Sequence, residues 1–186
     1  MPIVKIQKPN IITFTYKQLK DDDDYGSCLW ARFNLDLVSY TMTVESDCGN
    51  YSYSWSATPK TESFLHLCSR FNKDYLLEKF SNKNRVDVDE TVKAIFEWIE
   101  LNNIDINNPD LNSLKEIEFT SSGYTATFIE LEHKIDELGL NDIFDAEEIN
   151  DCIIMDYPYK ALKIVDVFIQ HIKPKIKEYE EGRQCD

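Results

Sequence analysis

The chain has 186 residues, of which 42% are hydrophobic and 12% aromatic, which suffices for one ordinary folded domain and excludes a disordered acidic tail. Its formal net charge is −14, from 34 acidic and 20 basic residues, and this sign argues against direct binding to a phosphate backbone, which takes Lys and Arg. The excess is asymmetric, because residues 1–85 carry 10 acids and 11 bases, whereas residues 86–186 carry 24 acids and 9 bases.

The cysteines and the N-terminus indicate a compartment. Five cysteines stand at positions 28, 48, 68, 152 and 185, without a C-x-x-C pair or a regular spacing. This pattern argues against a disulfide framework and against a zinc site, so we expect the reducing cytoplasm of a host cell. The N-terminus lacks a basic segment followed by a long apolar one, and no window approaches about 18 uninterrupted apolar residues, so neither export nor a membrane span is expected.

The first 57 residues show the two-residue period of β structure. The segment "IITFTY" (11–16) predicts a first strand, and the aspartates of "KDDDDYG" (20–26) then lie in a solvated loop. The clearest alternation is "CLWARFNLDL" (28–37), which directs five side chains to the core: Leu29, Ala31, Phe33, Leu35 and Leu37. The alternate positions face outward: Trp30, Arg32, Asn34 and Asp36.

A hairpin turn is expected at Gly49 and Asn50, which tolerate positive φ, and "YSYSWS" (51–56) then alternates aromatic residues with serines. An aromatic sheet face could stack nucleic-acid bases, but residues 27–57 carry only Arg32 as a base and so lack a basic groove. We therefore expect this face to pack on a helix over residues 62–71. Together these segments predict an antiparallel meander of three or four strands.

After Pro59 the apolar period changes to the 3.6 residues of a helix. Helices are predicted over residues 62–71 and 74–80. The segment "VDVDETVKAIFEWIE" (86–100) predicts a third helix, capped by Asp87 with Glu90 as its reciprocal partner. A fourth helix follows the apolar positions 128, 131, 135 and 138 and ends at Gly139, which suits the left-handed position after a helix.

The last third of the chain predicts two more helices. Asp145 and Glu148 repeat the capping pattern and open a helix through about Met155. Pro158 suits the first position of a long terminal helix, and Pro174 should kink or split that helix, because proline lacks an N–H and its ring clashes with the preceding turn. One side of this helix carries seven apolar residues: Leu162, Val165, Phe168, Ile169, Ile172, Ile176 and Tyr179.

The order of these elements predicts an α+β fold, in which a small N-terminal antiparallel meander sheet packs on helices and is followed by an acidic, mostly helical C-terminal half. We expect a single domain of residues 1–186. Within it, residues 1–85 hold the sheet and the first helices and are nearly neutral, while residues 86–186 form the acidic half.

No motif for catalysis, a cofactor or a metal ion stands out, so none of these is expected. His66 and Cys68 lie two residues apart on a helix and point away from each other. The five glycines form neither a G-x-G-x-x-G nor a P-loop pattern. The segment "DINNPDLNSLKE" (105–116) has the length of a calcium loop, but Pro109 stands at its fifth position and Asp110 at the sixth, where a glycine should turn the chain.

The segment from Glu130 to Asp156 carries ten carboxylates and one Lys. Carboxylates three or four residues apart on a helix lie about 5–6 Å from one another, and neighbouring helices of this kind can imitate duplex DNA, which presents one charge per roughly 1.7 Å of axis. The alternative is a solvated acidic face. The ten candidate partner-binding residues are Glu130, Glu132, Asp136, Glu137, Asp142, Asp145, Glu147, Glu148, Asp151 and Asp156.

Three segments of the first half resemble a family of small bacteriophage and prophage proteins: "WARFNLDL" (30–37), "SDCGNYSYSW" (46–55) and "SFLHLCSRFNKDYLLEKFS" (63–81). The resemblance implies a phage origin and brings no catalytic residues with it. It also implies a context, because small acidic phage proteins are often inhibitors of host defence, including anti-CRISPR and anti-restriction proteins that occupy the DNA-binding cleft of a nuclease.

These observations favour a non-enzymatic phage protein that binds a basic nucleic-acid-binding surface of a host defence complex, a CRISPR or restriction nuclease, by acidic DNA mimicry. One alternative is a protein–protein interaction module that uses exposed aromatics such as Trp30 or Tyr40. Another is a metal-dependent hydrolase assembled from dispersed carboxylates. The leading hypothesis implies a host protein partner, no direct contact with nucleic acid and no membrane, and it leaves the oligomeric state open.

Overall fold

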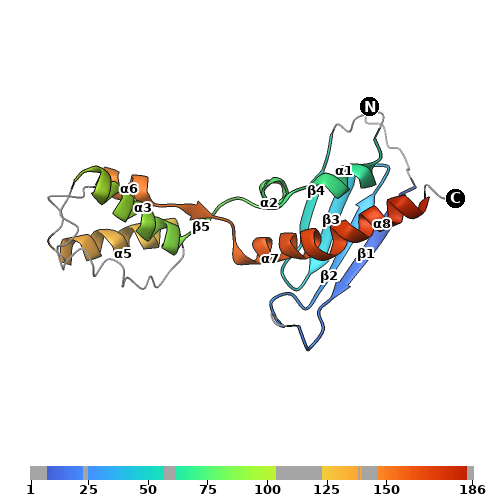
Figure 1. Ribbon diagram of the computed structural model, residues 1–186, viewed down its shortest axis with the longest axis horizontal. Helices are drawn as coiled ribbons and strands as arrows, with labels where there is room; N and C mark the ends of the chain where they lie inside the picture. The colour runs from blue at the N-terminus through green and yellow to red at the C-terminus, as the bar shows by residue number, and fades with distance from the viewer. Residues whose placement is uncertain are drawn as a thin grey trace, which may run out of the picture. The chain divides into compact units, whose positions relative to one another are not determined.

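The computed structural model describes residues 8–22, 25–56, 62–103, 123–137, 139 and 146–183 (Figure 1). The chain divides into two compact units. The sheet unit consists of Met1–Asn82 and Tyr159–Asp186, and the acidic unit of Lys83–Pro158. The acidic unit is therefore inserted into the sequence of the sheet unit, and the C-terminal helix belongs with the sheet rather than with the acidic helices.

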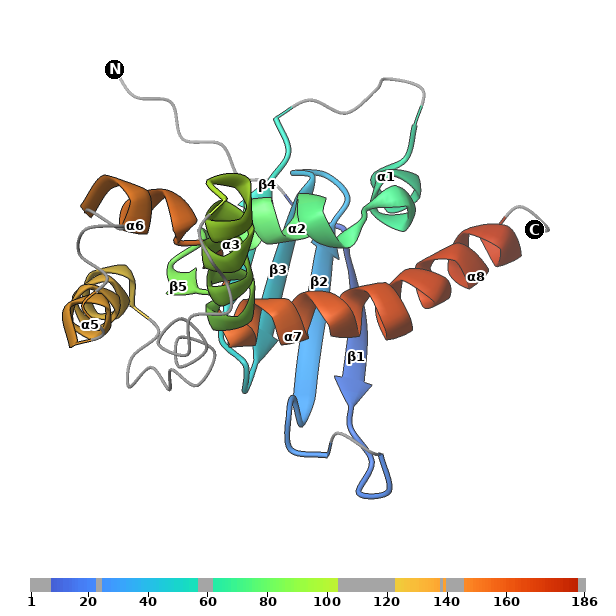
Figure 2. The same ribbon diagram turned by 60° about the vertical axis from the view of Figure 1, so that its left-hand side comes forward.

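The sheet unit contains a four-stranded antiparallel sheet in the order β1-β2-β3-β4, which confirms the predicted meander and the α+β class (Figure 2). The strands are β1 (Ile11–Lys17), β2 (Trp30–Asp36), β3 (Thr41–Ser46) and β4 (Tyr51–Ser54). Turns with positive φ connect the later strands, at Tyr40 with φ 52° and at Gly49 with φ 109°. The predicted alternation along β2 is confirmed, because Ala31, Phe33 and Leu35 are fully buried.

Two positions of this alternation differ from the prediction. Leu29 is 40% exposed, because it precedes the first residue of β2 and its backbone N–H donates to the side chain of Asp47. Leu37 is only half-buried, because β2 ends at Asp36 and the turn into β3 begins there. The two-residue period therefore holds within the strand and fails at the residues that flank it.

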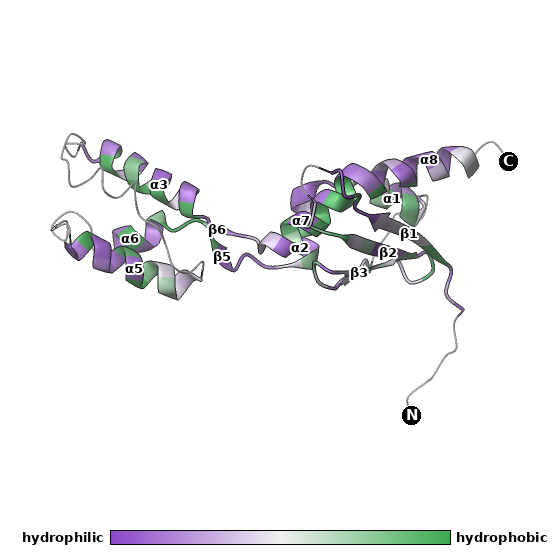
Figure 3. Cartoon of the chain, turned by 90° about the horizontal axis from the view of Figure 1, so that it is seen from below, coloured by the Kyte–Doolittle hydropathy of each residue, from purple (hydrophilic) through white to green (hydrophobic). Residues whose placement is uncertain are grey.

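Helices cover one face of the sheet (Figure 3). They are α1 (Phe64–Arg70), α2 (Lys73–Phe80), α7 (Tyr159–Val167), the π-helical turn η2 (Phe168–Ile172) and α8 (Lys173–Arg183). Phe168 is fully buried against Phe33 of β2, with ring centroids 5.7 Å apart. On the opposite face of the sheet, the described side chains of the strands are exposed or half-buried.

The aromatic face that runs from β4 to Trp55 packs on helices: Trp55 contacts the segment predicted for it, residues 62–71, whereas Tyr51 packs on α2 instead. Tyr51 stacks on Phe80 of α2 at 5.6 Å, and Trp55 stacks on Phe71 at 5.0 Å. The indole N–H of Trp55 donates to the hydroxyl of Tyr75 at 2.6 Å. These rings are committed to the core of the sheet unit, so they do not form an open platform for bases.

The terminal helix is interrupted where Pro174 predicts it. The N–H of Lys173 donates to the carbonyl of Phe168, five residues back, and the π-helical turn ends at Ile172, two residues before Pro174. Because proline has no N–H and clashes with the preceding turn, a local change of hydrogen-bond pattern lets the chain continue in one direction. Pro158 directly precedes α7, one residue before the position predicted for it.

The acidic unit contains α3 (Val88–Leu101), α5 (Tyr124–Glu137) and α6 (Ala146–Cys152). Their shared core consists of Ile95, Ile99, Leu131, Ile135, Ile149 and Cys152. The predicted cap Asp87 is confirmed, because its side chain accepts from the N–H of Glu90. Glu90 is not its reciprocal partner, because the N–H of Asp87 donates to the carbonyl of Ile154. Gly139 follows α5 with φ 66°, as predicted for the residue that ends this helix.

Helix α6 ends at Cys152 rather than at Met155, because the next residues pair with the start of the unit. The N–H of Ile154 donates to Oγ1 of Thr91, and its carbonyl accepts from the N–H of Asp87. Short strands β5 (Arg85–Val86) and β6 (Met155–Asp156) then pair antiparallel, so the chain enters and leaves the acidic unit side by side.

Some predictions concern residues outside those that the structure describes. They are the cap Asp145, the calcium-like segment 105–116, Leu138 and the aspartates at 23 and 24.

Candidate functional site: the acidic helical unit

The acidic unit holds the entire net charge of the protein. Residues 83–158 contain 19 acids and 5 bases, which gives −14, and the rest of the chain contains 15 of each. The sequence boundary near residue 86 comes close to the start of this unit but assigns the terminal helix to the wrong side. The sheet unit is neutral overall, so any electrostatic attraction of a basic partner at long range comes from the acidic unit.

The candidate residues on α5 and α6 point away from the shared core. On α5, Glu132, Asp136 and Glu137 are exposed and Glu130 is half-buried. On α6 the candidates are Glu147 and Asp151, which are exposed, and Glu148, which is half-buried. Because the buried positions of each helix occupy one side, these carboxylates occupy the flanks and the outer side. Asp142 and Asp145 lie outside the described residues.

Helix α3 adds four exposed acids that the sequence-based site left out: Asp89, Glu90, Glu97 and Glu100. They lie opposite Thr91, Ile95 and Ile99, which are buried. The signal for them was present in the sequence, since α3 has an apolar face and acids on the remaining positions. These acids do not form a dense acidic run in the sequence, because on α3 they are separated by the apolar residues of its buried face.

Some of the acidic charge is compensated within the unit. Asp156 of β6 forms an ion pair with Arg85 of β5, in which Oδ2 of Asp156 lies 2.8 Å from Nη2 of Arg85. This pair joins the two strands through which the chain enters and leaves the unit. Glu137 lies 3.3 Å from Nζ of Lys134 and 3.4 Å from Nδ1 of His133. Lys93 pairs with Glu90 on α3 at 3.2 Å. The pairs on α3 and α5 are largely exposed and are worth at most about 1 kcal/mol each, whereas the Arg85–Asp156 pair is partly buried.

The acids of this unit are arranged as a surface rather than as a pocket. Among the residues that the structure describes, they form no group of three whose carboxylate oxygens lie within 4.8 Å of one another. Exposed charges of one sign act together over about 8 Å at physiological salt. The arrangement can therefore attract and orient a basic macromolecule.

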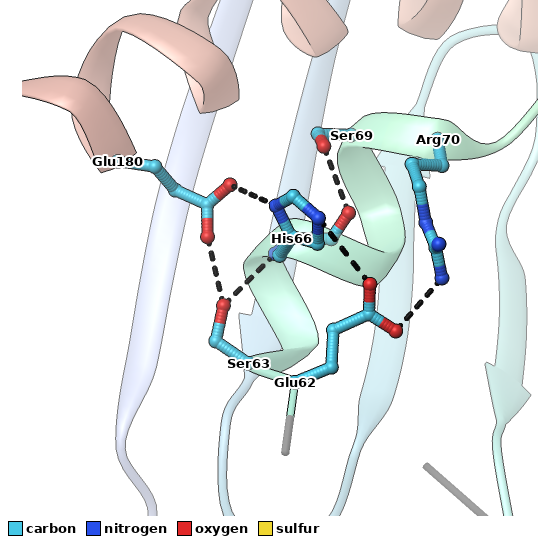
Figure 4. A network of polar contacts seen from close by, with 6 residues as sticks. All are labelled: Glu62, Ser63, His66, Ser69, Arg70 and Glu180. Carbon is cyan, nitrogen blue, oxygen red and sulfur yellow. Dashed lines mark hydrogen bonds and ion pairs between the residues drawn. The ribbon is translucent and has the colours of Figure 1, made fainter. Parts of the chain in front are cut away.

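A second polar cluster connects α1 to α8 in the sheet unit (Figure 4). The Nε2 atom of His66 lies 3.3 Å from Glu62, and its Nδ1 atom lies 3.5 Å from Glu180. The hydroxyl of Ser63 donates to Glu180 at 2.7 Å and accepts from the backbone N–H of His66 at 3.0 Å. Arg70 completes the cluster with an ion pair to Glu62 at 2.7 Å.

This cluster contains Ser, His and Glu but lacks the geometry of a catalytic triad. A general base must offer one imidazole nitrogen to the nucleophile, whereas both nitrogens of His66 face carboxylates and Ser63 donates to Glu180. A cavity of about 330 Å³ lies beside it, lined by Tyr40, Glu62, Ser63 and Glu180 among others. The cluster therefore joins two helices through charge and hydrogen bonds.

Of the aromatic residues expected to be exposed, only one is. Trp30 is 42% exposed on the open face of the sheet. Tyr40 is half-buried, because its ring packs edge to face on Phe64 of α1, with ring centroids 5.7 Å apart. In the described residues, no helix combines the length and the apolar character needed to cross a membrane.

Comparison with known proteins supports the origin that the first half suggests. The model of a phage protein family, Phage_phiTE_072, matches residues 9–178, which include both the sheet unit and the acidic unit. Searches of the curated proteins and of the solved structures found no match. Because the match extends over nearly the whole chain, it goes well beyond the three segments in the first half, and the chain belongs to this phage protein family.

Proposed function

We propose that this phage protein is a non-enzymatic inhibitor whose acidic unit binds a basic nucleic-acid-binding surface of a host defence complex, such as a CRISPR or restriction nuclease. The observation that carries the proposal is the separation of charge: residues 83–158 have a net charge of −14, and the remaining residues have a net charge of zero. Self-repulsion among these charges works against a compact unit, and a bound basic partner would relieve it.

The placement of the acids supports a macromolecular partner. Helices α3, α5 and α6 direct their apolar side chains to one core and their carboxylates to solvent. A basic cleft that normally holds DNA or RNA presents Lys and Arg at the spacing of phosphates, and such groups meet carboxylates on neighbouring helical turns. Electrostatic steering then gives fast association that falls steeply as salt rises.

The test uses charge reversal on the exposed acids. The two test variants are E132K/D136K on α5 and E97K/E100K on α3. Each changes the net charge by four units at exposed positions outside the core. The matched control is E78K/E181K, which makes the same change at exposed positions of the sheet unit. We expect at least about tenfold weaker capture of the partner from host lysate for one or both acidic-unit variants and no change for the control.

Two further measurements identify the kind of partner. The captured protein should be lost at about 0.5 M NaCl, where the Debye length falls to about 4 Å, and it should be displaced by duplex DNA or RNA added to the wash. Equal loss of capture in the control would show that total charge alone matters. A partner that stays bound in high salt and in the presence of nucleic acid contradicts mimicry.

A second candidate function rests on Trp30. Its 42% exposed indole lies on the sheet face that the described helices of the sheet unit leave open, and exposed aromatics are common anchors of protein interfaces. For such an interaction module, W30A would abolish capture and the charge reversals would leave it intact. Capture would then also survive high salt.

A further inference from the structure

Two cysteines that are 20 residues apart in the sequence lie together at one end of the sheet. In the antiparallel register of β2 and β3, Ala31 pairs with Ser46. The residues before β2 therefore lie beside the residues after β3, and this brings Cys28 to Cys48. Both thiols are buried, with 1% and 4% exposure.

Asp47 completes this group. The two Sγ atoms and a carboxylate oxygen of Asp47 all lie within 4.8 Å of one another. The distance from Sγ of Cys28 to Oδ1 of Asp47 is 3.7 Å. In a tetrahedral zinc site, metal–sulfur bonds of about 2.3 Å and metal–oxygen bonds of about 2.0 Å place two sulfurs about 3.8 Å apart and a sulfur and an oxygen about 3.5 Å apart. The distances between the three ligand atoms therefore need to shorten by no more than about 1.3 Å.

The carboxylate is held in place by the backbone. Asp47 accepts from the N–H of Leu29 at 2.9 Å and from the N–H of Trp30 at 3.2 Å. The thiol of Cys28 also donates to this carboxylate at 3.7 Å, and a cation would take the place of that proton. Burial works to raise the pKa of Asp47, but the N–H groups of Leu29 and Trp30, together with the other donors, outweigh it and the pKa lies below its ordinary value. The group is thus an oriented anion.

The two thiols differ from the carboxylate in their protonation. Burial raises the pKa of Cys28 and also that of Cys48, so each is a neutral S–H when no cation is bound. The thiol of Cys48 donates to the carbonyl of Ser27 at 3.1 Å. A thiophilic cation would displace both protons, because the thiolate is the form that binds metal.

We propose that Cys28, Cys48 and Asp47 form a binding site for a thiophilic divalent cation of the Zn²⁺ class, with solvent in the fourth position. Two thiolates select such a cation over Mg²⁺ and Ca²⁺, which take oxygen ligands. Asp47 is exposed, whereas the two cysteines are buried, so an ion can enter the site from the solvent beside Asp47. A bound ion would fasten the segment before β2 to the β3–β4 turn, next to the exposed Trp30.

The test uses the full-length chain, purified with a phosphine reductant, and Cd²⁺ as the probe. Two cysteine ligands give an ultraviolet thiolate-to-metal charge-transfer band that reaches its limit at one Cd²⁺ per chain, and Zn²⁺ in excess should remove this band. C28S and C48S should each lose the tight one-to-one band. C152S, which removes a buried thiol of the acidic unit, should keep it.

A second measurement needs no variant and so does not depend on whether the serine variants fold. Cd²⁺ should slow the alkylation of Cys28 and Cys48 in the native chain, mapped by mass spectrometry of peptides, and leave Cys68 and Cys152 unchanged. Absence of the band in the folded, reduced chain would overturn the proposal. So would a band that survives in both C28S and C48S, or a Cys28–Cys48 disulfide in the isolated protein that takes up no Cd²⁺ after reduction.

Discussion

Replacing Tyr75 with Phe removes one oxygen atom and leaves the indole N–H of Trp55 without the acceptor that lies 2.6 Å from it. Trp55 is only 7% exposed and contacts Phe64 and Phe71, with ring centroids 5.4 and 5.0 Å away, so water has little access to the freed N–H. A buried donor without a partner costs about 1–3 kcal/mol. We expect Y75F to lower the free energy of unfolding by about this amount.

Urea unfolding followed by tryptophan fluorescence measures the effect. With a denaturant slope of about 2 kcal/mol/M, the unfolding midpoint of Y75F should fall by about 0.5–1.5 M. Tyr53→Phe is the matched control, because the ring of Tyr53 contacts the same indole at 4.8 Å but its hydroxyl is not the indole's partner. Equal midpoints for Y75F and Y53F would refute the reasoning. In a double-mutant cycle with W55F, the hydrogen bond should appear as a coupling energy between the two positions.

Two further substitutions test the core of the acidic unit. Ile135→Ala should lower the free energy of unfolding by about 2–5 kcal/mol, because Ile135 is 1% exposed, whereas Ile129→Ala on the same helix should change it by less than about 0.5 kcal/mol, because Ile129 is 56% exposed. Similar urea midpoints for this pair would mean that α5 buries a different face. Thr91→Val should cost about 1–3 kcal/mol and speed hydrogen exchange at the amide of Ile154, which donates to the buried Oγ1 of Thr91 at 3.0 Å, and Thr91→Ser should restore part of the loss. A T91V protein with unchanged exchange at Ile154 would show that this bond does not hold the end of α6.

The charge separation bears on how the two proposals can be told apart. The mimicry proposal concerns residues 83–158, which carry the net charge, and the cation site lies in the sheet unit at Cys28, Asp47 and Cys48. Charge reversal on α3 or α5 leaves the cation site intact, and C28S or C48S leaves the acidic surface intact. Loss of capture and loss of the charge-transfer band are therefore separate outcomes.

Local patterns were sufficient for most of the secondary structure. The alternation of residues 28–37 predicted β2 and the buried face that it has within the strand, and Asp87 predicted the start of α3. Both signals depend on neighbours in the sequence, since a strand has a period of two and a cap bonds a residue three positions on. Pro174 likewise marked the break in the terminal helix, because the missing N–H is a property of that residue alone.

The errors occur where an element ends against something distant in the sequence. Leu29 seemed to continue β2, but Asp47, 18 residues later, accepts its N–H. Helix α6 was predicted to reach Met155, but Thr91 and Asp87 bond to Ile154 and stop it at Cys152. In both cases a hydrogen bond to a residue distant in the sequence takes the place of the backbone bond that would have extended the element, and no local pattern contains that partner.

The sequence by itself determined the α+β class, the antiparallel meander, the helical character of residues 88–101 and 124–137, and the excess of acids in the second half, because each depends on composition or on a short period. Only the tertiary structure decided that residues 159–183 pack on the sheet and that the net charge belongs to an inserted unit entered and left through β5 and β6. It also decided that Cys28, Asp47 and Cys48 lie together. These features arise from burial and strand pairing between segments far apart in the chain. Hydrophobic periodicity predicts that one face of an element will be buried, but it does not predict which other element will cover that face.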